Sequence, residues 1–171
     1  MRGLYFPSNG SIFDFLRPMF VRLDSLYWIV DCQSGPVRFD WIYESREHER
    51  IFEDMHIEVP AFESTSTHLW RPGSLALVQH ELYFDEWSYL VGFESTEEDA
   101  VQRATRIGFP GSFTPQFYLS LEREAEICLV QGDGWWEIYP TRADLFSEIQ
   151  AFTSCREIAT REHGDWMPEF V

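Results

Sequence analysis

The residues of this chain with the greatest potential for chemistry cluster around one expected strand turn. His80 and Glu81 precede Asp85 and Glu86, and an imidazole beside carboxylates is a ligand set that divalent metals accept. The ordinary alternative is a solvated hairpin whose charged groups face water. Because the chain has neither an HExxH pattern nor an HxH pair, we expect no metal and no other cofactor. A metal-dependent hydrolase built on these residues stays an alternative.

Two further patterns have both a chemical and an ordinary explanation. His48 and His56 would share a helical face with nearby acids, which is also how a solvated helix face looks. Glu137 beside Trp135 and Trp136, and Glu86 beside Trp87 in the His80–Glu86 region, resemble the carboxylates and stacking aromatics of glycoside hydrolases. With 29 acidic residues among 171, however, such neighbours arise by chance. A carboxylate-based hydrolase is therefore a second alternative.

The signatures of covalent catalysis and of phosphate binding are missing from the sequence. No GxSxG, GxGxxG or P-loop pattern occurs. All 13 basic residues are arginine, which excludes a Schiff-base lysine. The sequence therefore favours a binding protein over an enzyme.

The cysteines indicate a reducing compartment. Cys32, Cys128 and Cys155 are odd in number and have no CxxC spacing, which argues against a disulfide framework and a thiolate zinc site. We expect buried free thiols at Cys32 and Cys128. Because no export signal and no long apolar run is recognisable, we expect a cytoplasmic protein that does not enter a membrane.

The excess of acid is the feature that constrains a partner most. The formal charge is −16, and no cation occurs between Arg71 and Arg103. A field of this sign repels nucleic acid and anionic lipid and attracts basic surfaces. We therefore expect a basic protein partner, and the sequence leaves the oligomeric state open.

Hydrophobic periodicity predicts the elements that position these residues. We expect helices at 11–17 and 44–55, a loop at 60–73, and strands at 26–32, 37–43, 74–84, 87–93, 117–121, 126–130 and 135–139. Ser95 to Glu98 fits a capping box for a helix that ends at Gly108. Thr141 to Asp144 repeats that signal, and a last helix would run to about Glu162. Gly132 and Gly134 suit a tight hairpin.

This order of elements predicts one globular α+β domain over residues 1–171. Its core would be an antiparallel sheet of about six or seven strands, with helices packed mainly on one face. In size, charge and expected architecture the chain is similar to the small acidic immunity proteins that accompany polymorphic toxins, and it matches no family motif residue by residue. That resemblance implies an inhibitor of a basic bacterial effector or toxin. A DNA mimic and a housekeeping domain with charge only for solubility are further alternatives.

The expected binding surface combines the cation-free acidic segment with tryptophans that would anchor a partner. Its predicted residues are Glu81, Asp85, Glu86, Trp87, Glu94, Glu97, Glu98, Asp99, Trp135 and Trp136. Because Trp135 and Trp136 are adjacent on one strand, their rings should point to opposite faces, and at least one should lie in the core.

Overall fold

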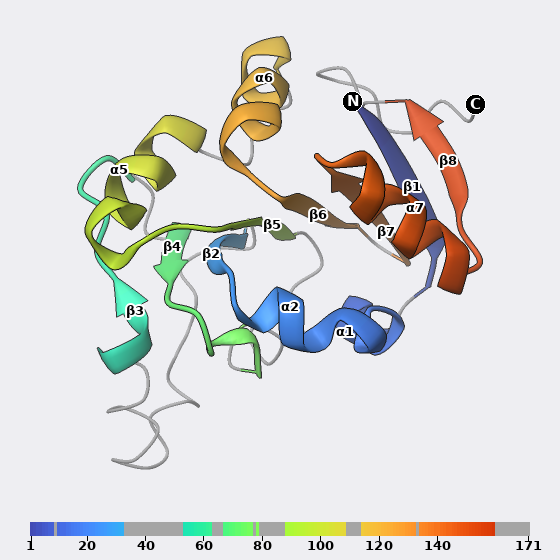
Figure 1. Cartoon of the computed structure of the whole chain (residues 1–171), viewed down its shortest axis with the longest axis horizontal. Coiled ribbons are helices and arrows are strands. Elements are labelled where there is room, and N and C mark those ends of the chain that lie inside the picture. The colour runs from blue at the N-terminus through green and yellow to red at the C-terminus, as the bar shows by residue number, and fades with distance from the viewer. Residues whose placement is uncertain are drawn as a thin grey trace.

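The computed structural model describes residues 1–8, 10–32, 53–62, 67–76, 78, 88–108, 114–132 and 134–159. Within these ranges the strands form one eight-stranded antiparallel sheet in the order β3-β4-β2-β5-β6-β7-β1-β8 (Figure 1). The strands are β1 (Arg2–Pro7), β2 (Tyr27–Cys32), β3 (His56–Ile57), β4 (Thr67–Trp70), β5 (Ser88–Phe93), β6 (Ile127–Gly132), β7 (Trp135–Pro140) and β8 (Arg156–Ala159). The predicted α+β class and antiparallel sheet are confirmed.

Helices cover both faces of the sheet, because its strands alternate two sets of apolar side chains. In β2, Trp28 and Val30 belong to one core cluster, and Tyr27 and Ile29 belong to the other. The first cluster is covered by α1 (Ile12–Phe15), the 3-10 helix η1 (Arg17–Met19), α2 (Phe20–Asp24) and α7 (Ala143–Phe152). The second is covered by α5 (Glu97–Ile107) and α6 (Pro115–Glu124). Most helical segments thus share one face, as expected, but the opposite face is covered too.

Several predicted elements are present with small shifts in their boundaries. Ser11 caps α1 by accepting from the Phe13 amide, and β2, β5, β6 and β7 match four predicted strands. The helix predicted after Ser95 is α5, but its cap is Thr96, whose hydroxyl accepts from the Asp99 amide. Gly134 has the positive φ expected in the hairpin, at 78°.

Other segments differ from the prediction because capping and long-range pairing decide them. Residues 117–121 are not a strand but part of α6, which Thr114 caps and where Phe117 and Leu121 are buried one helical turn apart. The expected loop at 60–73 contains β4, which pairs with β2. Residues 75, 76 and 78, expected in a strand, are helical.

The C-terminal part of the described chain also differs from the expectation. β8 replaces the helix expected up to about Glu162, because β1, a strand that the sequence did not reveal, offers it an edge. The strand expected at 37–43 and residues 44–52 of the helix expected at 44–55 lie outside the described residues, and residues 53–55 are helical as expected. None of the helices in the described ranges is long and apolar enough to cross a membrane.

Candidate functional site

One end of the sheet brings together acidic residues that are far apart in the sequence. The strand registers define this end by a row of paired residues that crosses from β3 to β7: His56, Trp70, Trp28, Gly92, Ile127 and Pro140. Chain segments that leave or enter the sheet at this row carry carboxylates. We call them the acidic rim, which comprises Asp54, Glu94, Glu97, Glu98, Asp99, Glu124, Glu126 and Asp144.

The predicted acids of the 94–99 segment all lie on this rim and are exposed. Glu94 follows β5, and Glu97, Glu98 and Asp99 form the first turn of α5. Their position is favourable because the N-terminal end of a helix carries partial positive charge. The helix dipole therefore stabilises the carboxylates of the first turn of α5.

Arg71 neutralises part of the rim, although it stands well before α5 in the sequence. It follows β4, and its guanidinium forms an ion pair with Glu97 and donates from Nε to the Asp54 carbonyl at 3.0 Å. The cation-free segment is therefore not free of cations in space. The Arg71–Glu97 pair also fixes the start of α5 against the segment that precedes β3.

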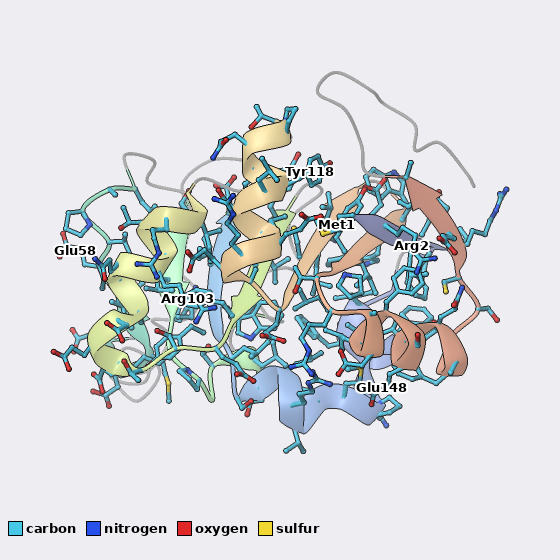
Figure 2. The ribbon with its side chains drawn as sticks, turned by 45° about the horizontal axis from the view of Figure 1, so that its top comes forward. Met1, Arg2, Glu58, Arg103, Tyr118 and Glu148 are labelled. Carbon is cyan, nitrogen blue, oxygen red and sulfur yellow. The ribbon has the colours of Figure 1, made fainter. Side chains whose placement is uncertain are left out.

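The other rim arginines are likewise paired. Arg103 and Arg106 of α5 contact the Glu124 carboxylate at 3.4 and 2.9 Å, and Figure 2 shows Arg103 on the side of α5 that faces the C-terminal end of α6. Arg142 binds Asp144 at 2.7 Å. The hydrogen bond between the two side chains is the main cause that raises the pKa of Arg142 and lowers the pKa of Asp144.

Carboxylates outnumber arginines at the rim, so a surplus of negative charge remains there. Within the described ranges, no ion pair joins an arginine to Asp54, Glu94, Glu98 or Asp99. All of these are exposed. The arginine pairs therefore reduce the negative charge of the rim without cancelling it, and the rim can attract cationic groups.

The two predicted tryptophan anchors have different environments. Trp136 is only 2% exposed and donates from Nε1 to the Gly10 carbonyl at 3.0 Å, so the expectation that it binds a partner is wrong. Trp135 lies on the opposite face, is half-buried, and stacks on Tyr5 with 6.2 Å between ring centroids. The rings do point to opposite faces, as predicted.

Trp135 is also separated from the acidic rim. It pairs with Gly132 at the end of the sheet where β5 begins, whereas α5 follows the other end of β5. A strand of this length spans roughly 17 Å at about 3.3 Å per residue. Trp135 and the rim are therefore not parts of one compact patch. The remaining predicted residues, Glu81, Asp85, Glu86 and Trp87, lie outside the described residues together with His80.

Two carboxylates are fully buried: Glu137, which the sequence singled out beside Trp135 and Trp136, and Asp31, which it did not. Asp31 accepts a hydrogen bond from the Thr67 hydroxyl at 3.0 Å, and Glu137 accepts one from the Tyr139 hydroxyl at 2.7 Å. Burial, with a smaller contribution from Glu137, raises the pKa of the nearby Cys128 thiol far above its usual range. That thiol is free and buried, as predicted, and is therefore unreactive. The sequence could have indicated the burial of Asp31, because this acid lies in the otherwise apolar segment 26–32.

The histidines give no metal centre among the described residues. No group of three or more His, Cys, Asp or Glu side chains there could hold an ion. His56 lies on β3 rather than on the helical face expected for it with His48. Its ring contacts His68 of β4, with the Nε2 atom of His56 3.1 Å from the Nδ1 atom of His68. The chain matches no protein-family model, no curated protein and no solved structure.

Proposed function

We propose that the chain is an acidic protein-binding domain, an immunity-type inhibitor of a basic bacterial effector or toxin. The observation that supports this proposal is the acidic rim, where exposed carboxylates from separate segments meet and outnumber their arginines. A cationic protein surface is the partner whose chemistry fits it.

The rim supports a mechanism in two steps. Long-range attraction would first orient the basic partner toward the N-terminal end of α5, where Glu94 and Glu98 are exposed. Short-range contacts would then set the dissociation rate. Trp87 and Trp135 stay predicted anchors, and Trp135 would be reached only by a partner that also covers the length of the sheet. We place the protein in the cytoplasm, where a free thiol such as Cys128 stays reduced.

The test compares two variant baits that each lose two carboxylates, from the rim in one and from α1 and α7 in the other, where Asp14 and Glu148 form ion pairs with Arg17 and Arg22 at 3.7 and 3.4 Å. The rim variant carries Glu94→Gln and Glu98→Gln. The control carries Asp14→Asn and Glu148→Gln, on α1 and α7, the helices of the other face (Figure 2). Wild type and both variants are immobilised, and basic proteins that they retain from bacterial extracts are identified and purified. Each purified protein is then assayed for its own activity and for toxicity to growth.

The proposal expects a basic protein that wild type and the control retain and the rim variant loses. Its activity should fall when wild type is added in equimolar amount. Equal retention by all three baits, or a retained protein whose activity the chain does not reduce, would contradict the proposal.

A further inference from the structure

A pair of histidines joins the two strands at one edge of the described sheet. β3 is a strand of two residues, and among the described strands only β4 pairs with it. His56 of β3 and His68 of β4 lie on the same face, with the Nε2 atom of His56 3.1 Å from the Nδ1 atom of His68. The rings meet edge to face at 5.2 Å, and His56 also contacts the Trp70 ring at 5.7 Å. Both imidazoles are half-buried.

This geometry limits how many protons the pair can hold. A hydrogen bond between two ring nitrogens needs one N–H donor and one lone pair, so the pair can be neutral or carry one extra proton. With two extra protons, both facing nitrogens would be N–H groups on cationic rings and could not remain 3.1 Å apart. Separated histidines, by contrast, each take up a proton near pH 6.5.

Burial disfavours a positive charge on the His56 ring. Burial is the main cause that lowers the pKa of His56, and the Glu58 carboxylate opposes it. On β2, the residues that face the pair are the apolar Trp28 and Val30. The other charged groups on the neighbouring described segments include Glu53 and Asp54, which precede β3, and Arg71, whose guanidinium is committed to Glu97 and the Asp54 carbonyl. The Asp31 carboxylate of β2 lies on the opposite face, where it accepts a hydrogen bond from the Thr67 hydroxyl of β4.

We infer that the His56–His68 pair is a pH-sensitive latch that holds β3 on β4 at neutral pH and releases it in acid. The sign follows from proton uptake: the released strands bind more protons than the closed pair, so the closed form loses stability as pH falls below about 6.5. Release would break the bond from the Arg71 amide to the Met55 carbonyl, 2.8 Å long, and with it the link between β3 and the rim. The latch does not depend on a partner and goes beyond the proposed function.

Amide hydrogen exchange measured by NMR tests the latch, because the Arg71 amide reports on β3 pairing. The protection factor, corrected for the intrinsic effect of pH on exchange, is measured at pH 7.5 and pH 5.0 in wild type and in His68→Gln. Glutamine can still form hydrogen bonds but does not titrate. The Thr141 amide, which bonds to the Glu126 carbonyl at 3.0 Å, serves as an internal control.

In wild type, Arg71 protection should fall by about tenfold or more between the two pH values, while Thr141 protection stays constant. In His68→Gln the Arg71 value should fall clearly less than in wild type, because only the burial of His56 then makes the pairing depend on pH. Constant Arg71 protection in wild type, or an equal fall in the variant, would overturn the latch. If the variant does not fold, the imidazole nitrogen resonances of wild type decide: coupled titration supports the latch, and two independent titrations near pH 6.5 overturn it.

Discussion

At the residue scale, the buried Glu137 is the side chain whose environment is most demanding. It is fully buried on β7, among aromatic neighbours, and Tyr139 donates a hydrogen bond to it. Moving a carboxylate from water into the core lowers the free energy of unfolding by roughly several kcal/mol unless the group is paired or hydrogen-bonded there. The Tyr139 hydroxyl is therefore part of what makes this acid tolerable in the core.

Replacing Tyr139 with Phe removes the donor but keeps the ring. We expect the free energy of unfolding to fall by about 1–3 kcal/mol, because Glu137 then loses a hydrogen bond while it stays buried. Urea unfolding followed by circular dichroism measures the loss. In the background of Glu137→Gln the same substitution should cost clearly less, and equal costs in both backgrounds would show that the two side chains are not coupled.

Residue types alone did not reveal which acids are buried. Glu94 and Glu98 were expected at the surface and are exposed, since they precede or open an amphipathic helix. Glu137 and Asp31 instead lie within strands whose two faces are both covered by other elements. That coverage depends on the packing of distant segments, which periodicity does not encode.

At the scale of elements, the residues that cap a helix account both for the prediction of α5 and for the missed helix α6. The start of α5 was predicted from Ser95, Thr96 and the following acids, and the helix is present one residue later. For α6, the alternation of Phe117, Leu119 and Leu121 favoured a strand, but Thr114 and Pro115 begin a helix. Local capping outweighed a period-two pattern there.

The choice of cap for α5 can be tested by two single alanine variants. Thr96→Ala removes the hydroxyl that accepts from the Asp99 amide and should destabilise the protein by about 1 kcal/mol. Ser95→Ala removes a hydroxyl that makes no hydrogen bond to the described part of the chain, so its effect should be close to zero. Thermal or urea unfolding of both variants measures the difference. If Ser95→Ala lowers the free energy of unfolding more than Thr96→Ala does, Ser95 is the cap, as the predicted capping box requires.

At the scale of the whole molecule, the acidic rim results from the order of strands in the sheet. Segments from Asp54 to Asp144 meet there because β3, β4, β5, β6 and β7 share one register row. The acidity of residues 94–99 was predictable from the sequence, but the return of Arg71 to Glu97 was not, because it depends on strand pairing. The rim thus carries less net charge than its sequence implies and still has exposed carboxylates in surplus.

Association kinetics at two salt concentrations test the rim as a binding surface most directly. With the basic partner in hand, the association rate constant is measured by stopped flow at about 50 mM and 500 mM NaCl, where the Debye length falls from roughly 14 to 4 Å. Wild type and the Asp14→Asn/Glu148→Gln control should associate at least about tenfold more slowly at high salt. The Glu94→Gln/Glu98→Gln variant should be slower at low salt and less sensitive to salt. Rates that do not depend on salt, or that are equal for the rim variant and the control, would contradict the account.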